Sequence, residues 1–142
     1  MNAIPEHRRN QRVNVSGYKV SFVDYGCYYK GVLQEASFDG LRVAFPPIGS
    51  QIGSQAIFWP NLSFFFHEMI WRNRMFRIAV STNTADNTHS GDLSGQEGKN
   101  CLVAAYPRWQ KKNDTWLEIG FKIHECPLIW KFFVHRKILG LP

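Results

Sequence analysis

Three arginines near the start of the sequence and a short polar segment further along hold the side chains best suited to chemistry. The first segment carries Arg8, Arg9 and Arg12, and the second reads Glu35-Ala36-Ser37-Phe38-Asp39-Gly40. A guanidinium group is a rigid fork of donors that binds phosphate oxygens bidentately. A serine hydroxyl donates hydrogen bonds, and glycine allows close backbone approach. Together the two segments predict an anion clamp and a small-residue turn that close on one ligand.

The residues around these two segments predict short β-strands. Residues 1–12 are polar and basic without a hydrophobic period, so we expect an exposed, mobile arm. β-Branched and aromatic residues then predict strands over 13–23, 28–33 and 41–45. We expect a bulge or bend at Gly17, a hairpin turn at 24–26 and a stop at Pro46-Pro47. Short strands joined by tight turns predict an antiparallel sheet or barrel.

The end of the chain repeats this texture and then changes to a helix. We expect strands over 101–109 and 115–123, joined by a polar turn at 111–114. Pro127 and Gly140 suit the start and the exit of a helix over 127–139. Apolar residues cover most of the circumference of this helix, so it must be covered on more than one side. A barrel would cover one face, and a partner subunit or a second structural layer the other.

The middle of the chain predicts a mixture of elements. Apolar residues over 62–70 follow a helical period after Pro60-Asn61. Residues 75–80 look like a strand, and 57–59 like another. Residues 82–100 are small and polar with three glycines, which predicts a flexible loop.

Length and composition limit the class of protein. At 142 residues, of which 44% are hydrophobic, the chain is expected to form one domain over 1–142 with its own core. It has no apolar run near the roughly 20 residues of a membrane helix. Residues 1–12 contain no signal-peptide core, so we expect a cytoplasmic protein. A formal charge of +6 favours an anionic partner such as nucleotide, nucleic acid or lipid.

The two chemical segments, in this order and with this strand context, resemble the signature of the PilZ domain family. That signature is R-x-x-x-R followed by (D/N)-x-S-x-x-G. Arg8 and Arg12 match its first half, whereas Ser37 and Gly40 match its second, with Glu35 in place of Asp or Asn. The resemblance covers 8–46 best and resumes over 101–139. It implies a mostly β fold, a six-stranded antiparallel barrel with a C-terminal helix. The helical period over 62–70 adds a helical insertion in the middle.

PilZ domains serve bacteria as receptors for cyclic di-GMP, so the resemblance implies a signalling protein that binds this nucleotide. The residues themselves show no nucleophile-type turn and no set of converging metal ligands, so we expect neither catalytic residues nor a metal. Arg8 and Arg12 would bind phosphates or guanine edges, and Arg9 would add positive charge. Glu35 would accept from guanine N–H groups, one methylene farther out than the family's residue. Ser37 would donate to a phosphate or sugar oxygen, and Gly40 would admit the ligand to the backbone. We expect the arm to fold over the nucleotide and alter a surface that a protein effector binds.

Other interpretations use different residues. A PilZ-like domain with weak or no nucleotide binding would act as a protein-interaction module, and the apolar helix could also form a homodimer. Tyr28, Tyr29 and Lys30 lie together on one expected strand and would suit base stacking in a nucleic-acid-binding barrel. Core packing explains most of the other aromatic residues, so we do not expect nucleic acid as the partner. His124 and Cys126, with Cys101, fall short of the three or four converging ligands of a metal site. The scattered cysteines predict ordinary reduced thiols.

Overall fold

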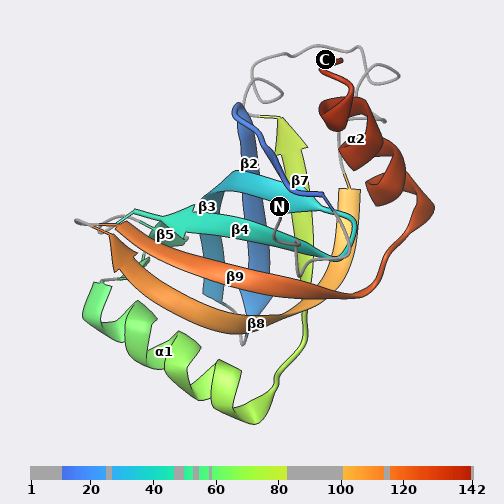
Figure 1. Ribbon diagram of the computed structural model, residues 1–142. Coiled ribbons are helices and arrows are strands. Elements are labelled where there is room, and N and C mark those ends of the chain that lie inside the picture. Colours follow the sequence, from blue (N-terminus) through green and yellow to red (C-terminus); the bar gives the residue numbers. More distant parts are fainter. Residues whose placement is uncertain are drawn as a thin grey trace, which may run out of the picture.

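The computed structural model describes residues 11–24, 27–46, 50–52, 55–57, 59–82, 101–113 and 116–141. Figure 1 shows strands that curve around a common centre, with one helix below them and another beside them. Arg8 and Arg9 lie outside the described residues, as do most of the expected arm and all of 83–100.

Six long strands close into an antiparallel barrel, as the sequence predicts. They are β2 (Tyr18–Asp24), β3 (Cys27–Ser37), β4 (Gly40–Phe45), β7 (Phe76–Thr82), β8 (Cys101–Asn113) and β9 (Trp116–Glu125). Pairing runs from β2 through β3, β4, β9, β8 and β7 and returns to β2. A short strand, β1 (Val13–Asn14), adds to the end of β3.

Alternating apolar side chains fill the barrel. Along β7, for example, Phe76, Ile78 and Val80 are buried, whereas the residues between them are exposed or half-buried. Successive strand residues point to opposite faces, so this pattern places one face of each strand in the core.

The helix α1 (Trp59–Arg72) confirms the expected helical insertion and covers one end of the barrel (Figure 1). Leu62, Phe66 and Met69 are buried on its inner face, at helical spacing. The ring of Phe66 meets that of Phe22 on β2 in an edge contact with centroids 6.1 Å apart. The outer face carries Phe64, which is exposed.

A small two-stranded sheet precedes this helix. It consists of β5 (Ser50–Ile52) and β6 (Gln55–Ile57). The strand expected over 57–59 is therefore wrong in its position, because Ile57 ends β6 and Trp59 begins α1.

Several other expected boundaries need correction. The strand expected over 13–23 is divided into β1 and β2, because Gly17 adopts a positive φ of 86° that turns the chain. The turn expected at 111–114 begins too early, since 111–113 continue β8 and Asn113 pairs with Trp116. Thr82, expected in the loop, ends β7. The last two errors arise because the chain pairs further than its local composition suggests.

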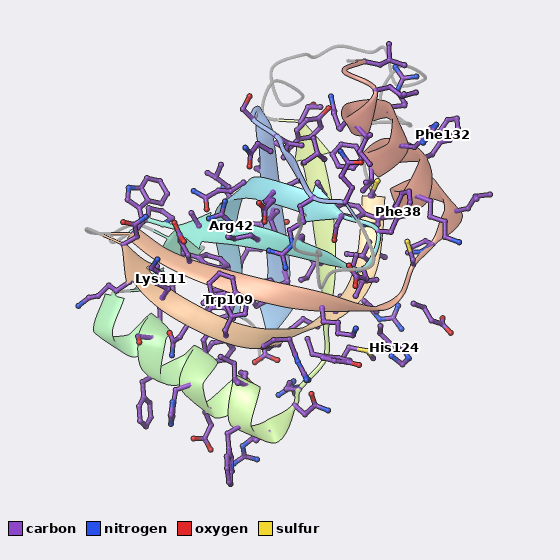
Figure 2. All side chains as sticks on the ribbon, viewed as in Figure 1. Phe38, Arg42, Trp109, Lys111, His124 and Phe132 are labelled. Atoms are coloured by element: carbon purple, nitrogen blue, oxygen red, sulfur yellow. The ribbon has the colours of Figure 1, made fainter. Side chains whose placement is uncertain are left out.

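The C-terminal helix α2 (Leu128–Ile138) lies against the side of the barrel (Figure 1). Pro127 occupies its N-cap position, and Gly140 follows it with a positive φ of 80°, as the sequence predicts. Trp130 and Val134 are the buried residues of the helix. Exposed apolar side chains cover its outer side, and Phe132 projects away from the barrel in Figure 2. The outer side includes Leu128, Ile129, Phe132 and Leu139.

Candidate ligand-binding site

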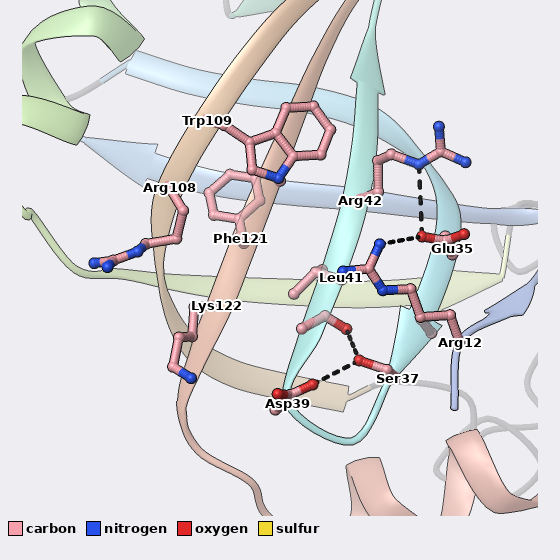
Figure 3. Close-up of a pocket in the computed structure, with 13 residues that line it drawn as sticks. Arg12, Glu35, Ser37, Asp39, Leu41, Arg42, Arg108, Trp109, Phe121 and Lys122 are labelled. Atoms are coloured by element: carbon pink, nitrogen blue, oxygen red, sulfur yellow. Dashed lines mark hydrogen bonds and ion pairs between the residues drawn. The ribbon is translucent and has the colours of Figure 1, made fainter. Parts of the chain in front are cut away.

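A hollow of about 170 Å³ opens on the barrel surface where β3, β4, β8 and β9 lie side by side (Figure 3). Its lining includes Arg12, Glu35, Ser37 and Gly40, which are four of the six residues that the sequence singles out. Arg8 and Arg9 lie outside the described residues. The fold therefore brings the end of the arm and the small-residue turn, which are separate in sequence, to one place.

The pairing of β1 with β3 sets Arg12 beside the turn. Val13 lies opposite Ala36 and Asn14 opposite Glu35, so the residue just before β1 reaches the end of β3. Arg12 Nη1 lies 3.4 Å from Glu35 Oε1. The Arg12 side chain is 44% exposed, so the contact lies at the open edge of the hollow.

Glu35 also contacts a second arginine. A register shift between Leu33 and Glu35 sets Glu35 opposite Arg42 on β4. Arg42 Nε lies 3.9 Å from the same Oε1 that Arg12 approaches (Figure 3). The Glu35 carboxylate is therefore held between two guanidinium groups, one just before β1 and the other on β4.

The turn between β3 and β4 is fixed by hydrogen bonds within it and by one from β9. The buried Ser37 hydroxyl donates to Asp39 Oδ1 at 2.9 Å and also lies 3.4 Å from the Gly40 carbonyl oxygen. The Ile123 amide of β9 donates to the Asp39 carbonyl oxygen at 2.9 Å. The expectation that Ser37 donates to a ligand thus requires its hydroxyl to turn away from Asp39.

Gly40 is required by close packing between strands. A Cβ atom at this position would lie 2.9 Å from the Phe121 carbonyl oxygen on β9. The φ angle of Gly40 is not among the positive values in the described chain, so backbone freedom is not the reason for glycine here. Its side-chain-free surface nevertheless forms part of the hollow.

Trp109 forms the wall of the hollow opposite the turn, and the sequence reasoning missed it. It lies across from Gly120 in the β8–β9 ladder, and its indole covers that glycine so closely that a Cβ atom would collide with the ring. Trp109 is 41% exposed, and its indole faces the hollow (Figure 3). The pairing of a tryptophan with a glycine could have been found by counting back from the β8–β9 turn, had that turn been placed correctly.

The hollow is rich in cations. Arg108 and Lys122 join Arg12 and Arg42 in its lining, against the carboxylates of Glu35 and Asp39. Arg108 Nη1 donates to Asn73 Oδ1 at 3.1 Å, which directs its guanidinium toward the end of α1. This excess of positively charged over negatively charged side chains favours an anionic ligand.

A buried hydrogen bond connects the turn to the C-terminal helix. Trp130 Nε1 on α2 donates to the Ser37 carbonyl oxygen at 2.8 Å. Trp130 is fully buried, and the chain between the two residues spans most of the barrel. The turn and α2 are therefore joined by a direct hydrogen bond.

The residues of the alternative interpretations take ordinary positions. Tyr29 is buried and its ring stacks on Phe22, so it cannot join Tyr28 in an exposed stacking surface. Burial raises the pKa of the Cys101 thiol to about 11. Burial also raises the pKa of Cys126, with the nearby Lys131 opposing and Asp39 adding to the shift.

Two further properties concern only the described part of the chain. Its histidines, cysteines and carboxylates do not form any group of three or more that could hold a metal ion. Neither of its helices has the length and apolar character needed to cross a bilayer.

Comparisons with known proteins identify the fold. No protein-family model and no curated protein matches the sequence. Among solved structures, the inhibitor of motility MotI of Bacillus subtilis is 10% identical, with 96% of this chain and 53% of that chain covered and a TM-score of 0.57. The MrkH–c-di-GMP complex of K. pneumonia is 9% identical, with coverages of 96% and 52% and a TM-score of 0.61.

A third structure is itself a single domain. The PilZ domain of YcgR from Escherichia coli, solved with c-di-GMP, is 9% identical, with 96% of this chain and 92% of that chain covered and a TM-score of 0.55. At such identities the similarity establishes the architecture, which is that of a PilZ domain. The chain spans about half the length of MotI and MrkH.

Proposed function

We propose that this protein is a cytoplasmic receptor for cyclic di-GMP and not an enzyme. The observation that carries the proposal is the β1–β3 register, which sets Arg12 3.4 Å from Glu35 at the rim of a hollow formed by the turn and Trp109. The solved structures of MrkH and of the YcgR PilZ domain, both with c-di-GMP, share this architecture.

In the proposed complex the arginine arm covers the ligand. The hollow lined by the described residues is smaller than the about 300–1,000 Å³ of pockets that enclose a small molecule, so a dinucleotide needs cover from another segment. Arg12 would exchange Glu35 for a phosphate oxygen or a guanine edge, with Arg8 and Arg9 contributing from further along the arm. Charge-assisted contacts of this kind must exceed an ordering cost of about 1–2 kcal/mol per residue.

The guanine bases would be held by Trp109 and Glu35. An exposed indole that is supported from behind by Gly120 offers a flat, rigid face for stacking. The Glu35 carboxylate would accept from guanine N–H groups. Because Glu35 has one methylene more than Asp, its position depends on the two arginines that contact Oε1.

Ser37 and Gly40 would shape the floor of the site. The Ser37 hydroxyl would turn from Asp39 to a phosphate or sugar oxygen, since both states offer it an acceptor. Gly40 would keep β4 close to β9 and leave room for the ligand above them.

The output surface in this proposal is α2. It carries exposed apolar side chains, and Trp130 connects it to the carbonyl of Ser37. Ligand-induced movement of the turn would shift the helix and alter the surface available to a protein effector, or to a second copy of the chain.

A calorimetric titration with cyclic di-GMP tests the proposal. Wild type should release heat with a dissociation constant in the micromolar range or below, and Arg12→Ala should weaken binding by roughly 10-fold or more. Arg77→Ala is the matched control, because Arg77 is an exposed arginine on β7 outside the hollow. Equal affinity in the Arg12 variant and wild type would refute the clamp.

A protein-interaction module without nucleotide binding is the second candidate. Its support is the Ser37 hydroxyl, which is already paired within the turn, and the apolar outer side of α2. Absence of heat with wild type at high micromolar cyclic di-GMP would favour this candidate over the receptor.

A further inference from the structure

The Glu35 carboxylate belongs to a longer row of alternating charges across the barrel surface. Arg12 Nη1 lies 3.4 Å and Arg42 Nε 3.9 Å from Glu35 Oε1. Arg42 Nη1 in turn lies 3.5 Å from Glu118 Oε1 on β9. Asn113 Nδ2 on β8 donates to the other Glu118 oxygen at 3.0 Å.

The two arginines at Glu35 are held very differently. Arg12 precedes a strand of two residues and leads into the arm. Arg42 lies within β4, which pairs with strands on both sides, and its far end is bound by Glu118, whose side chain is only 8% exposed. Arg12 is therefore the arginine that a ligand can draw away, and Arg42 the one that stays.

One atom of Arg42 is suited to bind the Glu35 carboxylate when Arg12 moves away from it. Its Nε is buried and has no hydrogen-bond partner within the described residues, although Glu35 Oε1 is 3.9 Å away. A buried donor without a partner is costly, and a small movement of the carboxylate would satisfy it. The same movement would draw the long Glu35 side chain toward the sheet.

We propose that Arg42, anchored by Glu118, is a positioning residue that retains the Glu35 carboxylate when Arg12 transfers to the ligand. Without it, Arg12 would have to leave a half-buried carboxylate behind, and part of the binding free energy would be spent on that separation. Arg42 thus adapts the site to Glu35, where the related signature has a shorter residue. This inference rests on the proposed binding of cyclic di-GMP.

A double-mutant cycle with cyclic di-GMP tests this role. We expect Arg42→Gln to weaken binding by about tenfold, the size typical of coupled neighbours. In a Glu35→Gln background the same change should have almost no further effect, because no carboxylate is left to retain. In an otherwise wild-type chain, Arg42→Lys should retain part of the affinity that Arg42→Gln loses.

The inference would be overturned if the double variant lost affinity by the product of the two single losses. Arg42 would then act independently of Glu35. Removal of Arg42 leaves Glu118 buried without its arginine and could unfold the chain. The cycle is therefore repeated in a Glu118→Gln background, where that charge is absent. If Arg42→Gln there weakens binding equally with Glu35 and with Gln at position 35, the role is also rejected. Failure of wild type to bind would refute the receptor proposal itself and is read from the first titration.

Discussion

Among single residues, Trp109 and Gly120 act as one unit. The glycine is needed because any Cβ atom would collide with the indole, and the indole owes its flat, fixed position to the glycine behind it. Neither residue belongs to the arginine arm or to the turn segment at 35–40. Together they supply the hydrophobic surface that the arginines and the turn lack.

Loss of this surface should weaken binding selectively. We predict that Trp109→Ala reduces affinity for cyclic di-GMP by roughly 10-fold or more, because base stacking on an aromatic side chain contributes about 1–3 kcal/mol. Calorimetry measures the effect. Trp71→Ala is the control, since Trp71 is 81% exposed on α1 and outside the hollow. Equal losses in both variants would argue against a stacking role.

At the scale of elements, the connection between the turn and α2 is the feature with the clearest mechanical consequence. Trp130 fills the space beneath the helix and also bonds to the Ser37 carbonyl oxygen. Tyr18 at the start of β2 meets Phe133 of α2, with centroids 5.0 Å apart in an edge contact. The helix is thus in contact both with the turn and with β2.

Replacement of Trp130 by Phe keeps most of this packing and removes the hydrogen bond. We predict a loss of about 1–3 kcal/mol in the free energy of unfolding, because the buried Ser37 carbonyl loses its donor. Urea denaturation measures it. Hydrogen exchange with and without cyclic di-GMP should then show a smaller ligand-induced change in α2 than in wild type. An undiminished change would mean that the signal reaches α2 by another route.

The elements themselves were predictable to different degrees. The strand at 41–45 and the C-terminal helix were confirmed almost to the residue. An alternating apolar pattern marks the strand, and Pro127 and Gly140 mark the two ends of the helix. The helix over 62–70 was confirmed by its spacing, although it begins earlier. The end of β8 was misplaced because Lys111, Lys112 and Asn113 are polar and exposed, yet remain paired with β9.

The same limit applies to the site. Arg12, Glu35, Ser37 and Gly40 could be named from the sequence, because their spacing in the chain is itself the signal. Trp109 and Arg42 could not, because their place in one hollow depends on the pairing of β4 with β9, which are distant in sequence. Counting back from the β8–β9 turn pairs Trp109 with Gly120, but it does not place that pair beside Arg42.

At the scale of the whole molecule, the parts of the proposed receptor form one neighbourhood. The arm leads into β1, β1 pairs beside the turn, and α2 contacts β1 and is bonded to the turn. α1 covers the barrel elsewhere (Figure 1). The ligand site and the proposed output surface therefore need no long pathway between them, since the turn belongs to both.

The most direct test of the receptor proposal is a pair of calorimetric titrations of the wild-type protein, one with cyclic di-GMP and one with cyclic di-AMP. The two ligands carry the same phosphates and differ in their bases, so phosphate attraction alone would not separate them. We predict binding of cyclic di-GMP and a loss of about 5- to 100-fold for cyclic di-AMP, as expected when bidentate base contacts fail. Equal affinity for both ligands, or no heat with cyclic di-GMP, would contradict the proposal.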